Sequence, residues 1–80
     1  MTIEVRLFAT LAKFLPPGSQ GDAATLHVPD GSTVRDVVRG LGIPVDMPAI
    51  VLVNGRDAAG DRALAPSDVL TMFPPLAGGR

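Results

Sequence analysis

The 80-residue chain contains no cysteine, no tryptophan and no tyrosine. The missing thiol excludes disulfide bonds and cysteine-ligated zinc, so any sulfur chemistry would have to use a different group. The charge is nearly balanced, with seven basic and eight acidic residues and a formal net charge of −1. This balance favours neither nucleic acid nor an anionic membrane as a partner, and we expect neither.

Long apolar runs are also missing. No stretch approaches the roughly 20 residues that a membrane-spanning helix needs, and the sequence shows no signal peptide, so a cytoplasmic protein is expected. Hydrophobic residues nevertheless make up 46% of the chain, which is enough for a core. The length predicts one small domain that buries roughly 60% of its unfolded surface.

Alternation between apolar and polar residues predicts a half-buried strand over residues 2–8, and the turn residues 64–68 predict a last strand after them. In this last strand, Leu70 and Met72 would face the core. Asn54-Gly55 is typical of a tight hairpin turn, and the apolar run before it predicts a central buried strand. A short helix or wide turn is expected over residues 9–15. The predicted strands cover residues 2–8, 25–28, 50–53, 57–59 and 69–73.

One amphipathic helix is predicted after Thr33. Thr33 and Asp36 have the spacing of a capping box, and the valines that follow recur at the spacing of one helical face. Gly42 is placed to end the helix in a left-handed conformation, with Ile43 as the apolar residue after it. A single helix needs one sheet to cover its apolar side.

This order of elements predicts an α+β fold of the β-grasp, or ubiquitin-like, type. A mixed sheet of four to five strands would pack on one main helix, with the first and last strands parallel at its centre. We expect the domain to span residues 1–73 and to be followed by a flexible Gly-Gly tail over residues 74–80.

The sheet face away from the helix is expected to be apolar. The predicted phases place Phe8, Ile50, Leu52, Thr71 and Phe73 on that face. An exposed apolar patch usually marks a partner surface, so these five residues are candidates for partner binding. The alternative is that residues 9–15 or the proline-rich neck cover part of the patch.

The C-terminal segment is the candidate reactive element. Two prolines cannot donate to a sheet, so the last strand should end at Phe73. Gly78 and Gly79 have no Cβ and present a thin backbone that would fit a narrow active site. The alternative is an ordinary frayed terminus. The predicted tail consists of Pro74, Pro75, Leu76, Ala77 and Gly78 before Gly79.

No catalytic constellation of side chains is apparent. His27 is the single histidine and falls on an outward strand position, which favours a surface role over a triad role. Asp57, Asp61 and Asp68 are interpreted as solvated turn carboxylates. We therefore expect no bound cofactor, no metal site and no enzymatic activity of the chain itself.

Three stretches carry a family resemblance that spans nearly the whole chain. They are Val5-Arg6-Leu7-Phe8-Ala9, Val53-Asn54-Gly55, and Asp68-Val69-Leu70 running to Phe73-Pro74-Pro75-Leu76-Ala77-Gly78-Gly79. Together they resemble the small sulfur-carrier subunit of molybdopterin synthase, and the Phe-Pro-Pro-x-x-Gly-Gly ending is the most specific part. The thiamine-pathway sulfur carrier is similar in fold and in its Gly-Gly end, but it usually lacks Phe-Pro-Pro.

The resemblance implies a carrier whose C-terminal glycine is chemically activated by other proteins. An ATP-dependent activating enzyme would adenylate the Gly79 carboxylate, and a sulfur donor would convert it to a thiocarboxylate. The large subunit of molybdopterin synthase would then accept the sulfur for molybdenum cofactor biosynthesis. ATP would be used by the activating enzyme and would not be held by this chain.

Arg80 departs from the pattern of the family, in which the second glycine is commonly the last residue. An amide at Gly79 cannot be adenylated, so we expect a processing peptidase to remove Arg80. Two alternatives remain open at the level of sequence. The chain could carry sulfur for another product, such as a thiazole, an amino acid or another thio-metabolite, or it could be a ubiquitin-like interaction module or protein modifier.

Overall fold

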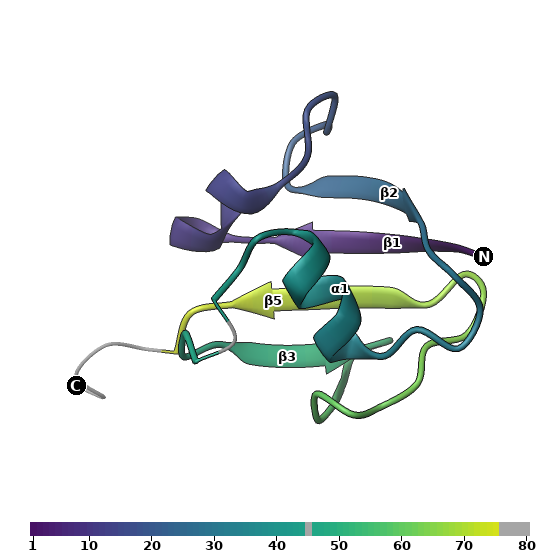
Figure 1. The fold of residues 1–80 in the computed structure, drawn as a ribbon. Coiled ribbons are helices and arrows are strands. Elements are labelled where there is room, and N and C mark those ends of the chain that lie inside the picture. Colours follow the sequence, from purple (N-terminus) through teal and green to yellow (C-terminus); the bar gives the residue numbers. More distant parts are fainter. Residues whose placement is uncertain (45, 76–80) are drawn as a thin grey trace.

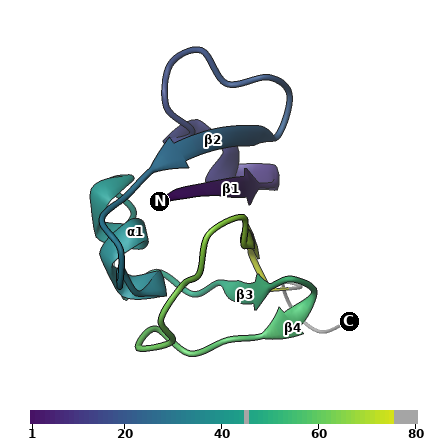
Figure 2. The same ribbon diagram turned by 90° about the vertical axis from the view of Figure 1, so that its right-hand side faces the viewer.

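Five strands form one mixed sheet in the computed structural model, which describes residues 1–44 and 46–75. In chain order the elements are β1 (Thr2–Leu7), the 3-10 helix η1 (Ala9–Phe14), β2 (Ala23–His27), α1 (Val34–Gly40), β3 (Ile50–Val53), β4 (Arg56–Asp57) and β5 (Val69–Phe73). The strand order is β2-β1-β5-β3-β4; Figure 1 shows the first four strands, and Figure 2 shows β4 beside β3.

The first and last strands lie parallel at the centre of the sheet. β1 pairs with β5 in parallel, and the other three contacts between neighbouring strands are antiparallel. The helix α1 crosses one face of this sheet, as Figures 1 and 2 show from two directions. This is the predicted α+β β-grasp arrangement, and the prediction is confirmed.

The core lies between α1 and the sheet. The inward residues of the two central strands are almost completely buried, and Leu70 and Met72 of β5 have exposed fractions of 0% and 2%. Both residues therefore face the helix, as their alternation predicted. The buried cluster comprises Ile3, Val5, Leu7, Leu11, Val34, Val37, Val38, Ile43, Val53, Leu64, Leu70 and Met72.

Both ends of α1 are closed by hydrogen bonds that the sequence predicted. The Thr33 hydroxyl accepts from the Asp36 backbone N–H over 3.2 Å, and the Asp36 carboxylate accepts from the Thr33 backbone N–H over 3.0 Å. At the other end Gly42 has φ +83°, and the Ile43 N–H donates to the Val38 carbonyl over 3.1 Å. This is a Schellman motif, which satisfies carbonyl groups that a short helix leaves open.

Several element boundaries differ from the predictions. β2 begins at Ala23, two residues early, because its N-terminal half pairs with β1 up to Arg6. β4 covers residues 56–57 and not 57–59. Asn54 and Gly55 have φ +52° and +85°, the signs of a type I′ turn, so pairing resumes directly at Arg56. Residues 9–15 contain a 3-10 helix, and β1 ends at Leu7.

The prediction that residues 50–53 form a buried strand is wrong for three of the four positions. Only Val53 is buried, whereas Ile50, Val51 and Leu52 are half-buried. This is because β3 lies next to the edge of the sheet, where its outer neighbour β4 is only two residues long. In addition, Ile50 and Leu52 face the side of the sheet that α1 does not cover.

Candidate functional site

The sheet face opposite α1 collects the side chains that were predicted to bind a partner. In the register of β3 and β5, Ile50 lies opposite Phe73 and Leu52 lies opposite Thr71. Directly opposed residues of antiparallel strands project to the same face, so these four side chains form one contiguous group. All four are half-buried in the isolated chain.

Phe8 joins this group through the backbone at the end of β1. Its N–H donates to the Met72 carbonyl over 3.1 Å, and its φ of −117° and ψ of 160° are extended. The residue thus continues the alternation of β1 onto the open face. Ala9 then has φ +54°, which turns the chain into η1. The structure therefore brings all five predicted partner-binding residues onto one face.

The apolar members of this group are separate from the core. Half-buried residues such as Val51, Leu26 and Phe14 pack against the core cluster, but Phe8, Ile50, Leu52 and Phe73 are not among those that do. We call these four residues together with Thr71 the open-face patch.

Residues 9–15 do not fold over the patch, in contrast to the alternative considered from sequence. Leu11 of η1 is 1% exposed and belongs to the core, and Phe14 and Leu15 also pack against the core. The three large apolar side chains of this segment are therefore directed to the same interior that α1 covers.

The open face is polar at one end and apolar at the other. Near the start of β1 the Glu4 carboxylate pairs with the Arg6 guanidinium, and the Thr2 hydroxyl lies 3.1 Å from Nδ1 of His27. His27 is exposed, as predicted. The apolar end lies where β5 finishes at Phe73 and leads into the neck. A partner that covers the patch would therefore sit next to the start of the tail.

The tail itself is only partly described. β5 ends at Phe73 as predicted, Pro74 is half-buried and Pro75 is exposed. The predicted reactive residue Gly79 lies outside the described residues. So do the tail residues Leu76, Ala77 and Gly78 and the adjoining Arg80.

Asp68 is not the solvated turn carboxylate that the sequence suggested. It is 8% exposed, and its carboxylate accepts from the Ala65 N–H over 2.8 Å and from the Asn54 side-chain amide over 2.9 Å. The Arg62 guanidinium lies 3.5 Å away. The Ala65 hydrogen bond, followed by that from Asn54, holds the pKa of Asp68 below its usual value.

This polar group was missed because its members are distant in sequence. Asn54 and Asp68 are 14 positions apart, and only the pairing of β3 with β5 brings them together. Asp57 and Asp61 are exposed, in agreement with the prediction. Across residues 1–44 and 46–75 we find no group of histidine, aspartate and glutamate side chains that could hold a metal ion. No helix in the same residues is long and apolar enough to cross a membrane.

A parallel pair of first and last strands, one helix across the sheet and a C-terminal Gly-Gly sequence define a ubiquitin-like β-grasp protein. The family model described as Mut7-C ubiquitin matches residues 1–78, and the chain belongs to this family. A comparison with curated proteins finds no match.

Solved structures give the same fold. SAMP1 from Haloferax volcanii is 32% identical with a TM-score of 0.74, over 99% of this chain and 100% of that one. A protein assigned as subunit 1 of molybdopterin converting factor from Pyrococcus furiosus is 25% identical with a TM-score of 0.73, over 94% and 98% of the two chains. A chain in a complex of subunits 1 and 2 of molybdopterin-converting factor from Helicobacter pylori is 16% identical, over 99% and 100% of the chains, with a TM-score of 0.63.

The Helicobacter pylori structure is related by fold alone. Together the similarities place the chain among small ubiquitin-like carrier proteins, and the predicted resemblance to the sulfur-carrier family is confirmed.

Proposed function

We propose that the chain carries sulfur as a thiocarboxylate on Gly79 and donates it in molybdopterin biosynthesis, as the small subunit of molybdopterin synthase. The observation that carries this proposal is the position of the open-face patch. Phe73 ends β5 within the patch, and the sequence then runs through Pro74 and Pro75 to the two glycines. A partner seated on the patch would receive the tail directly.

The activation step needs a free carboxylate at Gly79. Arg80 is joined to Gly79 by an amide, so a peptidase must first hydrolyse that bond. An activating enzyme would then join the carboxylate to AMP from ATP, with release of pyrophosphate. A sulfide donor would displace AMP, forming the C–S bond as the bond between the acyl carbon and the phosphate oxygen breaks. All acid, base and metal groups for these steps would come from the partner enzymes.

The first experiment tests the activation chemistry. The chain ending at Gly79 is incubated with its activating enzyme and ATP, and intact-mass spectrometry is used to detect the acyl-adenylate. With a sulfide donor present, we expect the mass gain of one oxygen replaced by sulfur. The chain that retains Arg80 is the matched control and should gain neither group. Failure of the truncated chain to form an adenylate would count against sulfur carriage.

The second experiment identifies the acceptor. Capture with the truncated chain as bait should recover a molybdopterin synthase large subunit, and Phe73→Asp bait should not. Recovery of a different biosynthetic enzyme would instead support sulfur delivery to another product.

Protein modification is a second candidate function. SAMP1, which is 32% identical over nearly the whole chain, is a small archaeal modifier protein by name. A modifier would form an isopeptide bond between Gly79 and a lysine of a target protein. Digestion of cell extracts and mass spectrometry of lysines that carry the C-terminal remnant of this chain would reveal such conjugates.

A further inference from the structure

The outer edge of β2 is a second surface with a defined chemistry. β2 ends the strand order and pairs only with β1 among the described strands. The Val28 N–H donates to the Met1 carbonyl over 2.9 Å, so this pair is hydrogen-bonded. Hydrogen-bonded and non-hydrogen-bonded pairs alternate in an antiparallel ladder. The backbone N–H and C=O groups of Thr25 and His27 therefore point away from β1.

The hydrogen bonds of the neighbouring strand β1 independently show that the backbone groups of Thr25 point outward. Glu4 is the partner of Thr25, and its N–H donates to Asp68 on the other side of β1 over 3.0 Å. Ala23 also points outward, but its N–H and C=O exchange hydrogen bonds of 3.1 Å with Gln20. Within residues 1–44 and 46–75, the outward backbone groups of Thr25 and His27 have no such partner.

Two hollows flank this free edge. One lies between β2 and α1 and is lined by Leu26, Val28 and Leu41, with Asp30 and Asp36 at the same site. Leu26, Val28 and Leu41 are half-buried apolar side chains, so this hollow can accept apolar groups.

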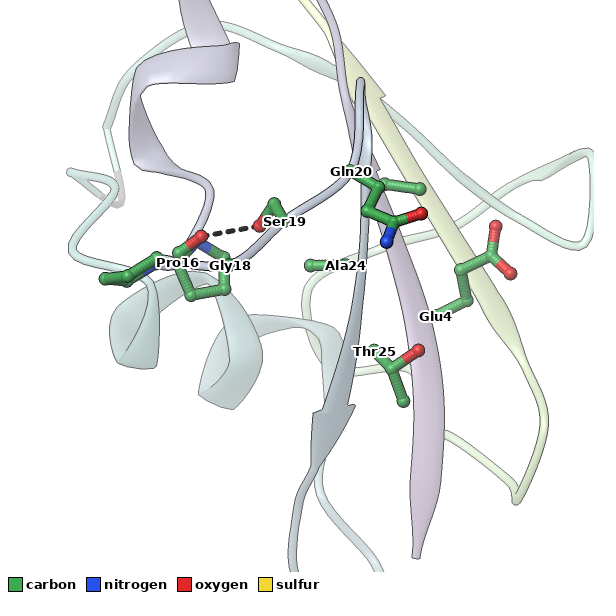
Figure 3. A pocket seen from close by; sticks show the side chains of 9 residues that line it. Glu4, Pro16, Gly18, Ser19, Gln20, Ala24 and Thr25 are labelled. Carbon is green, nitrogen blue, oxygen red and sulfur yellow. Dashed lines mark hydrogen bonds between the residues drawn. The ribbon is translucent and has the colours of Figure 1, made fainter.

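The second hollow lies between β2 and the turn that precedes it, and it is more polar. Glu4, Gln20 and Thr25 line it together with the turn residues (Figure 3). In Figure 3 the Ser19 hydroxyl donates to the Pro16 carbonyl, a contact of 2.5 Å that closes the turn beside the strand.

We propose that this edge binds an extended peptide segment of a partner protein, which adds to the sheet beside β2. The backbone of the segment would pair with the N–H and C=O groups of Thr25 and His27. Successive side chains of a strand point to opposite faces, so apolar residues would enter the hollow beside α1. The residues between them would be polar and would face Glu4 and Gln20.

The charges at the two ends of the edge select the flanks of that segment. Asp22 precedes β2 and Asp30 follows it, and both are exposed. Asp30 contacts the N-terminal ammonium group over 3.2 Å but keeps 90% of its side-chain surface exposed. Neither hollow is lined by a lysine or an arginine. The segment should therefore carry lysine or arginine on both sides of its apolar residues.

The same charges disfavour a second copy of this chain as the occupant. Two β2 strands that pair antiparallel would join Thr25 of one copy to His27 of the other, which centres the pairing on Leu26. That register places Asp22 of one copy opposite Asp30 of the other, at both ends. Carboxylates directly opposed across strands are destabilising, so a heterologous segment fits this edge better.

The proposal can be tested on the whole chain with the fluorescein-labelled peptide Lys-Thr-Val-Thr-Val-Thr-Val-Thr-Lys, in which the lysines share the face of the valines and can lie opposite Asp22 and Asp30. We expect saturable binding in fluorescence anisotropy and slower hydrogen exchange at the amides of Thr25 and His27. Thr25→Pro removes an outward N–H and should weaken binding about tenfold, the scale of one or two hydrogen bonds. Thr25→Val keeps that N–H and the branched shape, so it is the matched control and should bind like the unmodified chain.

A second set of binding measurements tests whether Asp22 and Asp30 select a basic segment. The double variant Asp22→Asn and Asp30→Asn should bind the lysine-flanked peptide about threefold more weakly, as expected for exposed ion pairs. A peptide with glutamine in place of both lysines should bind both proteins equally. Circular dichroism of each variant checks that the fold is retained, and the exchange footprint on the unmodified chain tests the proposal even if Thr25→Pro fails to fold.

Three results would overturn the proposal. They are the absence of saturable binding at millimolar protein, protection of amides other than Thr25 and His27, and sedimentation that shows self-association through β2. The inference does not rest on sulfur carriage, because the β2 edge is separate from β5 and the tail. Adenylation of Gly79 should be unaffected by Thr25→Pro, so the two proposals can fail independently.

Discussion

The Asn54 side-chain amide donates to the buried Asp68 carboxylate over 2.9 Å and so joins the β3–β4 turn to the segment before β5. Asn54 also accepts from the Val69 N–H through Oδ1 over 2.9 Å and donates its own N–H to the Val69 carbonyl over 2.8 Å. The residue thus adds one pairing to the β3–β5 ladder from within a turn. This fixes where β5 begins and, with it, which side chains of β5 reach the open face.

Replacing Asp68 should lower stability and change its dependence on pH. Asp68→Asn removes the charge that the Ala65 N–H and Asn54 stabilise, and should cost about 1–3 kcal/mol at neutral pH. The folded pKa of Asp68 is lowered, so its contribution is complete above the unfolded value of 3.8 and is lost as the pH falls through the lower folded value. Urea unfolding at neutral pH and below pH 3.8 measures both effects.

Asp61→Asn is the control for this prediction, because Asp61 is an exposed turn carboxylate. Its free energy of unfolding should stay within about 0.5 kcal/mol of the unmodified chain. Asp36 also has a lowered pKa, from the Thr33 hydrogen bonds, and it contributes equally in every variant. If the Asp68→Asn variant lost as much stability on acidification as the unmodified chain, that loss could not be assigned to Asp68.

Two glycines near the end of α1 should respond to alanine in opposite ways. Gly40 is helical, and an added Cβ would meet no atom within 4 Å. Gly40→Ala should therefore raise the free energy of unfolding by about 0.5–1 kcal/mol. Gly42 has equal space but φ +83°, so Gly42→Ala should lower it by about 1–2 kcal/mol. Equal effects of the two substitutions in chemical denaturation would contradict the left-handed C-cap.

Neighbouring residues of β5 should differ sharply in their contribution to stability. Leu70 is 0% exposed beneath α1, so Leu70→Ala should cost about 2–5 kcal/mol through lost burial and a cavity. Val69 faces the other side of the sheet and is half-buried, so Val69→Ala should cost about 1 kcal/mol or less. Thermal unfolding of the two variants checks the assignment of faces; a larger loss for Val69→Ala would reverse it.

The open-face patch should govern partner binding without governing the fold. Phe73→Asp places a charge in the patch and should abolish binding to the large subunit proposed as the partner, while stability changes by about 1 kcal/mol. Thr2→Asp adds the same charge to an exposed position at the polar end of the face and should leave binding intact. Calorimetric titration measures binding, and loss of the folded circular dichroism signal in Phe73→Asp would show that Phe73 belongs to the core.

Local patterns were sufficient for most of the fold. In β5 the alternation identified the inward residues, because a strand exposes one side-chain set to each face regardless of its neighbours, and the two prolines after Phe73 identified where the strand ends. The capping box and Gly42 placed both ends of α1, since capping depends on residues within one turn. Predictions failed where a boundary depended on a partner strand, as at Ala23 of β2 and at the short β4.

The amino-acid sequence alone determined the β-grasp class, the faces of the central strands and the composition of the open-face patch, because these follow from side-chain periodicity along single elements. Only the tertiary structure decided that Asp68 is buried with Asn54, that residues 50–52 are half-buried, and that the edge of β2 keeps two residues with outward backbone groups. Each of these depends on which strands become neighbours, and that is set by long-range pairing across the sheet.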